Sequence, residues 1–232
     1  MVEAIIVAAG LGTRMGPGVD KLFLPVAGRP LITHTWQRFD QAACIEAIVL
    51  VVRERMQRAF TDLAREYGFT KPHRLVVGGQ ERQDSVWHGL QALEPACEIV
   101  AIQDGARACT TEALITATVQ AAREAGAAVA AQRVTDTVKE SGDGTWIEAH
   151  GDRSRLWMVQ TPQTFRVEVI RRALAAARER GLRVTDDTAA CELTGQRVRL
   201  VESAAPNPKV TTPTDLAYVE VLLRQRDSRR PR

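Results

Sequence analysis

The feature that most constrains the fold of this chain is a regular alternation between short apolar runs and longer segments with helical periodicity. Each apolar run is rich in β-branched residues and lacks polar alternation, which is typical of strands buried on both faces of a sheet. Five such runs occur, at residues 4–10, 47–52, 74–79, 98–104 and 127–134. Because helices between successive strands favour parallel connections, we expect an α/β fold: a Rossmann-like three-layer sandwich with a mostly parallel sheet.

Proline and glycine mark the ends of the predicted helices. Pro30 stands where the first turn of a helix begins, and Gly68 and Gly126 stand where helix C-caps belong. Further elements are predicted at 167–181 (helix), 197–202 (strand) and 213–224 (helix).

The alternation breaks between about residues 133 and 160. Polar and apolar residues alternate here, and the sequence SGDG at 141–144 is a strong hairpin turn signal. We interpret the segment as a protruding β-arm that leaves a single domain spanning residues 1–232. Because Trp146 and Ile147 on this arm need a surface to cover them, the sequence predicts a homodimer, with the arm used for dimerisation.

Composition excludes several function classes. The 232 residues carry a net charge of only +3, and few aromatic residues interleave with basic ones, so we expect no nucleic-acid partner. No run of about eighteen apolar residues could span a membrane. The N-terminal sequence lacks the basic region and cleavage site of a signal peptide, so a cytoplasmic location is predicted. The four cysteines are scattered, which argues against a zinc site or a disulfide framework.

Residues 8–16, AAGLGTRMG, directly follow the first predicted strand. Gly10 and Gly12 allow the backbone to turn tightly and to aim successive N–H groups at an anion. Arg14 adds a forked cation, and the flexible Lys21 can fold back onto the same anion. The spacing matches neither the P-loop signature nor the dinucleotide fingerprint. We therefore expect a loop that binds the phosphates of a nucleoside triphosphate.

Asp104 ends a predicted buried strand and is followed by Gly105. In open α/β sheets, ligands bind beyond the carboxyl ends of the strands, and a carboxylate at that edge is a natural ligand for Mg²⁺ or for its water shell. We expect Arg107 to pair with a substrate phosphate or to hold Asp104 in place. The sequence therefore predicts a magnesium-dependent site at this edge of the sheet.

The string AAGLGTRMG…DKLFLPVAGRPLI resembles the opening of the pyrophosphorylase-type nucleotidyltransferases. Six later segments narrow the resemblance to the 2-C-methyl-D-erythritol 4-phosphate cytidylyltransferase family of the non-mevalonate isoprenoid pathway, and the likeness covers essentially the whole chain. These segments are VVGGQERQDSV (76–86), QDGAR (103–107), DTVKE (136–140), DRSRLWMVQTPQTF (152–165), TDD (185–187) and PKVTTPTDL (208–216).

The resemblance implies transfer of CMP from CTP to a small phosphorylated polyol, methylerythritol phosphate, with Mg²⁺ as cofactor. The catalytic residues would be Arg14, Lys21 and Lys209. The nucleotide would be bound by Ala8, Ala9, Gly10, Gly12, Gly79, Gln80 and Ser85. The polyol phosphate would be bound by Arg107, Thr137, Arg153, Thr161 and Thr185, of which Thr137 and Arg153 would reach across the dimer.

Several alternatives stay open at this point. A ribitol-5-phosphate cytidylyltransferase, or another sugar-phosphate nucleotidyltransferase, would share the CTP half of the site. A non-catalytic nucleotide-sensing module is an alternative of another class, against which Lys21 and Asp104 argue, because simple binding needs neither. An NAD-dependent oxidoreductase is disfavoured by the loop spacing and by Arg53, which stands where an acidic residue would end the second strand.

Overall fold

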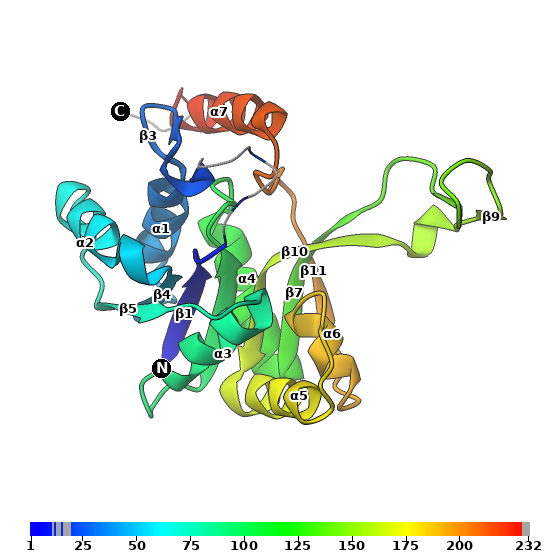
Figure 1. The fold of residues 1–232 in the computed structure, drawn as a ribbon, viewed down its shortest axis with the longest axis horizontal. Coiled ribbons are helices and arrows are strands. Elements are labelled where there is room, and N and C mark those ends of the chain that lie inside the picture. Colours follow the sequence, from blue (N-terminus) through cyan, green and yellow to red (C-terminus); the bar gives the residue numbers. More distant parts are fainter. Residues whose placement is uncertain (11, 13–14, 16–19, 229–232) are drawn as a thin grey trace.

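The computed structural model describes residues 1–10, 12, 15 and 20–228, and its centre is a seven-stranded sheet (Figure 1). The strands lie in the order β11-β7-β10-β6-β1-β4-β5. Their bounds are β1 (Val2–Val7), β4 (Ala47–Val52), β5 (His73–Val77), β6 (Ile99–Asp104), β7 (Ala127–Arg133), β10 (Trp157–Arg166) and β11 (Arg199–Glu202). Only β10 is antiparallel to its neighbours β6 and β7, so the prediction of a mostly parallel sheet is confirmed.

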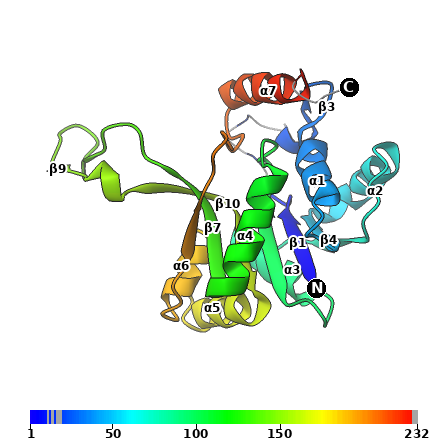
Figure 2. The ribbon, with the colours of Figure 1, turned by 180° about the vertical axis from the view of Figure 1, so that it is seen from behind.

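Helices cover both faces of this sheet, as a three-layer sandwich requires (Figures 1 and 2). One face is covered by α1 (Leu31–Gln41), α2 (Gln57–Glu66) and α4 (Glu112–Ala125), and α7 (Pro213–Ser228) packs against the same core from beyond the carboxyl ends of the strands. The other face is covered by α3 (Arg82–Gln91), α5 (Val167–Glu179) and α6 (Asp187–Glu192). Successive strand residues point to opposite faces: Ala4 and Ile6 pack under the first group of helices, and Ile5 packs under the second.

The predicted helix boundaries agree with the structure where a capping residue marks them. Gly126 is the C-cap of α4 and has a left-handed backbone, with φ of 84°. Pro30 is the N-cap of α1, one residue before the helix. Shorter elements complete the chain: the strands β2 (Pro25–Val26) and β3 (Arg29–Pro30) form a small hairpin, and 3-10 turns span Lys21–Phe23, Glu54–Met56 and Arg153–Arg155. No described helix is long and apolar enough to cross a membrane.

Two strands differ from the sequence prediction. β5 is half-exposed and not buried on both faces, because it is the edge strand and pairs only with β4. β10 begins at Trp157, so the last residues assigned to the arm belong to the main sheet, which they enter between β6 and β7. Its inner half carries buried Gln160 and Gln163, whose amides donate to Gln132 Oε1 and Asp186 Oδ2. Hydrophobicity alone gives no signal for such a strand.

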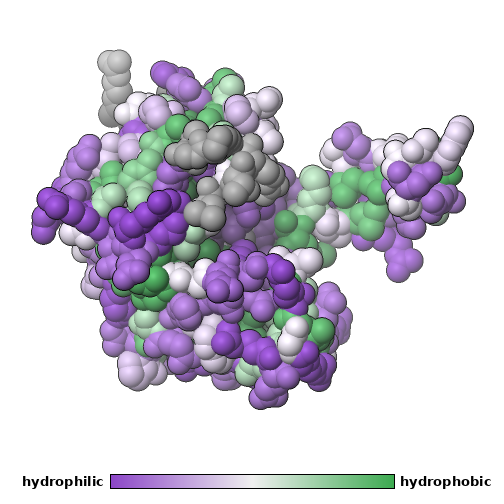
Figure 3. Space-filling model, in the orientation of Figure 1, coloured by the Kyte–Doolittle hydropathy of each residue, from purple (hydrophilic) through white to green (hydrophobic). Residues whose placement is uncertain are grey.

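Residues 134–156 form the arm, which projects from the body at the end of β7 (Figure 1). Its ladder is short: β8 (Lys139–Glu140) pairs antiparallel with β9 (Ala149–His150). The loop between these strands carries Trp146 and Ile147, whose exposed fractions are 74% and 69%. Figure 3 shows hydrophobic side chains on the surface of the arm, far from the helices of the body.

Candidate active site

A cavity of about 520 Å³ lies at the carboxyl ends of β1 and β6. This is the edge at which open parallel sheets bind ligands, and the volume is within the usual range for small-molecule sites. Its lining includes ten of the residues predicted from the sequence: Ala8, Ala9, Gly10, Gly12, Lys21, Gly79, Gln80, Ser85, Asp104 and Lys209. It also includes Val7, Leu22, Arg53, Glu81, Arg82, Gly105, Ala106 and Thr211. Segments from both ends of the chain therefore meet at one site.

The segment after β1 forms one wall of the cavity. Gly12 has a left-handed backbone with φ of 64°, and a Cβ atom there would lie 3.3 Å from the Cγ of Lys21. A side chain at this position would thus be strained and would press on the lysine stem. Arg14, which the sequence predicts as catalytic, lies outside the described residues.

The turn between β5 and α3 forms the opposite wall. Gly79 N–H donates to the Ser85 hydroxyl at 3.1 Å, and Glu81 and Asp84 form a reciprocal capping box at the start of α3. Gly78 is fixed by close packing, because a Cβ atom there would collide with the Cβ of Ala9. Because Gly78 has no side chain, the turn can pack directly against Ala9 in the segment after β1.

Four cationic side chains and two carboxylates line the cavity, counted over the described residues: Lys21, Arg53, Arg82, Lys209, Glu81 and Asp104. Lys21 Nζ donates to the Val210 carbonyl at 2.8 Å and so reaches from the N-terminal segment to the C-terminal one. Arg53 forms an ion pair with Asp20, one residue before Lys21. The positive excess suits an anionic ligand such as a triphosphate.

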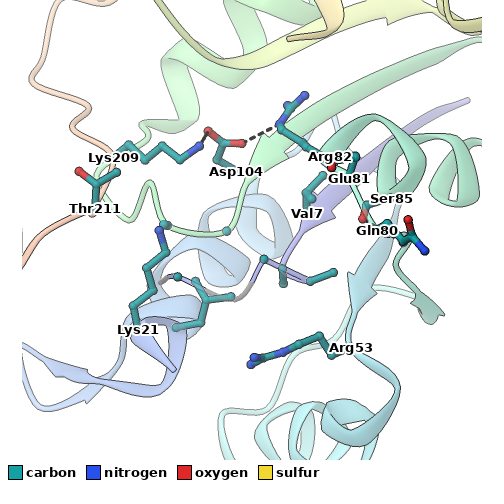
Figure 4. Close-up of a pocket in the computed structure, with 18 residues that line it drawn as sticks. Val7, Lys21, Arg53, Gln80, Glu81, Arg82, Ser85, Asp104, Lys209 and Thr211 are labelled. Carbon is teal, nitrogen blue, oxygen red and sulfur yellow. Dashed lines mark hydrogen bonds and ion pairs between the residues drawn. The ribbon is translucent and has the colours of Figure 1, made fainter. Parts of the chain in front are cut away.

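Asp104 is the charged centre of the site (Figure 4). Lys209 Nζ lies 2.8 Å from its Oδ2 and Arg82 Nε lies 3.2 Å from its Oδ1, so the two cations approach from opposite sides. Arg107 Nε lies 3.5 Å from Oδ2. Burial raises the pKa of Asp104, but Arg82, Lys209 and Arg107 together hold that pKa well below its ordinary value. The carboxylate is therefore ionised at neutral pH.

Arg82 belongs to a second ion pair behind this centre. Its Nη1 lies 2.8 Å from Oδ2 of Asp187, a fully buried residue at the start of α6. Burial lowers the pKa of Arg82, yet Asp187 and Asp104 outweigh burial and raise it. Burial also raises the pKa of Asp187, and Arg82 opposes that rise. One guanidinium thus bridges two carboxylates that stand 83 positions apart in the chain.

Asn207 fastens the segment that carries Lys209. Its side chain is almost fully buried, accepts from the Thr110 hydroxyl at 2.9 Å and donates to the Thr161 carbonyl at 2.9 Å. Its own carbonyl accepts from Arg107 Nη1 at 2.7 Å. These bonds tie the loop to β10 and to the turn after β6, which places the lysine over Asp104.

The five residues predicted to bind the polyol phosphate do not line the cavity. Arg107 contacts Asp104, as one of its two expected roles requires. The Thr161 hydroxyl accepts from the Asp104 backbone N–H at 3.1 Å, so Thr161 helps to hold the backbone of Asp104 in place. Thr185 is exposed on the segment before α6. Thr137 and Arg153 are exposed on the arm, where Arg153 Nη1 donates to the Thr135 carbonyl at 2.7 Å.

Sequence reasoning missed Arg53, Arg82 and Asp187 as parts of the site. Arg53 directly follows a correctly predicted strand, so its position at the carboxyl edge was a usable signal. Arg82 and Asp187 lie inside the motif segments VVGGQERQDSV and TDD. Their pairing joins two helix starts far apart in sequence, and no local pattern reveals such a contact.

The residues around Asp104 fit a metal ion that is held jointly by the protein and by a bound substrate. Among the described residues, no three His, Cys, Asp or Glu side chains come together as a protein-only metal site. Mg²⁺ is commonly held by one or two carboxylates together with substrate phosphates and water. The ionised Asp104 at the edge of a cationic cavity fits that arrangement, in which a bound triphosphate would supply the other oxygen ligands.

Comparison with known proteins places the chain among cytidylyltransferases. The family model described as IspD, 2-C-methyl-D-erythritol 4-phosphate cytidylyltransferase, matches residues 2–225. The enzyme of that name from Caldanaerobacter subterraneus subsp. tengcongensis is 39% identical, with 97% of this chain and 99% of that enzyme covered. The bifunctional enzyme IspD/IspF of Desulforudis audaxviator is 45% identical over 95% of this chain, which spans 56% of that longer protein.

A solved structure gives the same result. The crystal structure of 4-diphosphocytidyl-2C-methyl-D-erythritol synthase from Anaerococcus prevotii has a TM-score of 0.85 and 29% sequence identity to this chain, and 96% of each chain is covered. The fold and the sequence motifs therefore point to the same group of proteins.

Proposed function

Because the chain belongs to the 2-C-methyl-D-erythritol 4-phosphate cytidylyltransferase family, we propose that it transfers CMP from CTP to methylerythritol phosphate in isoprenoid precursor synthesis. The products are 4-diphosphocytidyl-2-C-methyl-D-erythritol and pyrophosphate. The observation that carries this proposal is the cavity beyond β1 and β6, which cations from four segments line and in which two of them, Arg82 and Lys209, contact the ionised Asp104 carboxylate.

In the transfer, an oxygen of the methylerythritol phosphate attacks the α-phosphorus of CTP. The new P–O bond forms as the bond to the pyrophosphate breaks, and no covalent intermediate with the enzyme is needed. A phosphomonoester is already largely anionic at neutral pH, so no general base is required. The enzyme has to bring two mutually repelling anions together and to stabilise the charge that develops at the α-phosphorus.

The residues around the cavity are suited to these two tasks. Gly79, Gln80 and Ser85 line the cavity, and we assign their backbone groups and the Ser85 hydroxyl to the edge of the cytosine. Lys21 Nζ already lies across the cavity, and we assign it the contact to the α-phosphate in the transition state. Lys209 and Arg14 are assigned to the remaining phosphate charge.

We propose Mg²⁺ as the cofactor, held by Asp104 and by the oxygens of the triphosphate. The ion would neutralise part of the charge on the triphosphate when it is bound. Arg82, Lys209 and Arg107 support this assignment because they keep the Asp104 carboxylate ionised and oriented toward the cavity.

We further propose that the working enzyme is a homodimer in the cytoplasm, where CTP is available. The polyol phosphate would be bound by Thr161, Thr185 and Arg107 of one chain and by Thr137 and Arg153 on the arm of the other. This arrangement is supported by the arm residues, which are exposed and do not line the cavity of their own chain, by the projection of the arm from the body (Figure 1) and by the uncovered Trp146.

The proposal is tested by turnover of the purified protein with each of CTP, UTP, ATP and GTP. Each nucleotide is paired with methylerythritol phosphate or ribitol phosphate, in Mg²⁺ or in excess chelator, and pyrophosphate release is measured. We expect turnover with CTP, methylerythritol phosphate and Mg²⁺ together. Turnover with ribitol phosphate alone would assign the chain to that substrate, and CTP binding without turnover on either alcohol would identify a sensing module.

A further inference from the structure

A buried carboxylate lies behind the cavity and takes no part in lining it. Asp187 is fully buried at the start of α6. Apart from the ion pair with Arg82, its two carboxylate oxygens have no hydrogen-bond partner among the described residues. The Arg82 guanidinium is therefore the group that compensates the charge of Asp187.

The same guanidinium reaches the reactive side of the site. Its Nε lies 3.2 Å from Asp104 Oδ1, while its Nη1 lies 2.8 Å from Asp187 Oδ2. Arg82 begins α3, Asp104 ends β6 and Asp187 begins α6, so three element ends meet at one planar group. A guanidinium held by two carboxylates has a fixed orientation, whereas one held by a single carboxylate can turn about that contact.

Stability does not account for a carboxylate in this place. Asp187 is fully buried and Arg82 is partly buried, so their ion pair costs desolvation, and replacing buried pairs by apolar groups is often neutral or stabilising. Asp186, the preceding residue, already caps α6 through its hydrogen bond from Ala189 N–H at 2.9 Å. The start of the helix is thus secured without the Asp187 charge.

We propose that Asp187 is a positioning residue for the cytidylyl transfer: it fixes the orientation of Arg82, and Arg82 in turn fixes the Asp104 carboxylate. The inference rests on the proposed function, which places Asp104 at the triphosphate and its metal ion. Arg82 contacts the proposed metal ligand directly, and loss of such a partner typically changes activity by about 10–100-fold. Removal of Asp187 is expected to have an effect of this size because it releases Arg82 from Asp104.

The first test compares Asp187→Asn with Asp186→Asn. Both changes remove one carboxylate from adjacent residues, and Asn is as good a helix N-cap as Asp. We expect Asp187→Asn to lower kcat by about 10–100-fold and Asp186→Asn to change kcat by less than about twofold. Circular dichroism and thermal melting establish that both variants are folded. Equal kcat for Asp187→Asn and the wild type would overturn the proposal.

The second test separates positioning from a general packing role. In a double-mutant cycle, Asp187→Asn is added to Arg82→Gln, and residues that act through one another show non-additive effects. We expect Asp187→Asn to cause less than about a twofold further loss of kcat in the Arg82→Gln background. Independent losses that multiply would show that Asp187 acts by another route.

A structural readout tests the link without substrates or metal. In crystals of ligand-free Asp187→Asn, we expect the Arg82 guanidinium to have left its contact with Asp104 Oδ1, and in Asp187→Glu, which keeps the charge, to retain it. An unchanged contact in Asp187→Asn contradicts the inference. If the wild type itself shows no turnover, the proposed function fails, and this structural comparison still decides whether Asp187 orients Arg82.

Discussion

The cavity and the arm are built by different kinds of contact. At the cavity, side chains bridge elements far apart in the sequence: Lys21 donates to the Val210 carbonyl and Arg107 to the Asn207 carbonyl. In the arm, contacts are local, such as those of Asp143 Oδ1, which accepts from the N–H groups of Thr145 and Trp146 at 2.8 and 3.1 Å. The cavity is thus shaped within one chain, whereas the arm keeps its own shape but leaves apolar side chains exposed.

This contrast assigns separate tasks to the two regions. The body of one chain supplies the charged groups that a nucleotide and a metal ion would need. The arm adds no group to the cavity of its own chain, and Thr137 and Arg153 are exposed on it, where Arg153 Nη1 donates to the Thr135 carbonyl. Nucleotide binding should therefore respond to changes in the body, and acceptor binding to changes in the arm.

The largest loss of activity is expected when Lys21, one of the cations that line the cavity, is replaced. Lys21→Ala removes the cation assigned to the transition state, and loss of such a contact typically costs about 10²–10³ in kcat. Steady-state kinetics at saturating CTP measure this loss.

A control is Lys71→Ala, because Lys71 Nζ donates to the Ala42 and Phe39 carbonyls away from the cavity. We expect the control to lower thermal stability while kcat stays close to that of the wild type. Near-wild-type turnover of Lys21→Ala would reject its role.

The next prediction tests whether the arm of one chain completes the active site in the body of the other. Two inactive subunits, Lys21→Ala and Arg153→Ala, are co-expressed with different tags and the mixed dimer is purified. If the arm serves the neighbouring chain, one of the two sites contains only intact parts, and the mixed dimer has about half of the wild-type kcat. Arms that serve their own chain would leave both sites defective and the mixed dimer inactive.

Dimerisation itself is tested by changing the exposed apolar tip of the arm. Burying a large apolar side chain typically contributes about 1.5–3 kcal/mol, so Trp146→Ser with Ile147→Ser should raise the dimer dissociation constant by about 10²-fold or more. Both side chains are more than two-thirds exposed in the single chain, so the fold of the body should be unaffected. Analytical ultracentrifugation measures the constant. Val221→Ser on α7, where an apolar side chain is 51% exposed outside the arm, is the matched control and should leave the dimer intact.

Several strands of the sheet and several residues of the cavity were predictable from the sequence. The apolar runs predicted the strands because burial on both faces leaves a continuous hydrophobic signal, and β4 coincides with the predicted run 47–52. The glycine-rich segment and Asp104 were predicted separately, as parts of a triphosphate site and of a magnesium site, and Gly10, Gly12 and Asp104 line one cavity because the carboxyl ends of neighbouring parallel strands lie at one edge. Local patterns are enough where local chemistry dictates the structure.

The remaining features depend on contacts that no local pattern records. The inner half of β10 is buried and polar, and its amides are satisfied by partners in β7 and in the segment before α6. The bridge from Asp187 through Arg82 to Asp104 joins three distant segments. Hydropathy does not distinguish such buried, paired polar groups from solvated ones, so the charges behind the cavity emerge only when the chain is folded.

The smallest expected effect concerns the anchoring of the segment that carries Lys209. Asp215 Oδ2, in the first turn of α7, accepts hydrogen bonds from the N–H and hydroxyl groups of Thr211 and Thr212. Burial raises the pKa of Asp215, but these bonds together outweigh it and lower the pKa from 3.8 to about 2. The ionised carboxylate is therefore the form that stabilises the folded state.

A group whose pKa is lower in the folded chain contributes its stability above its unfolded pKa and loses that contribution as the pH falls through the folded pKa. Asp215→Ala should thus lower the free energy of unfolding by about 1 kcal/mol near neutral pH, as for a lost helix cap. The difference from the wild type should shrink from pH 4 downward and vanish only below about pH 2. Urea unfolding of both proteins across this range measures it. A difference that persists unchanged at pH 2 would mean that Asp215 stabilises the segment by packing and not by its charge.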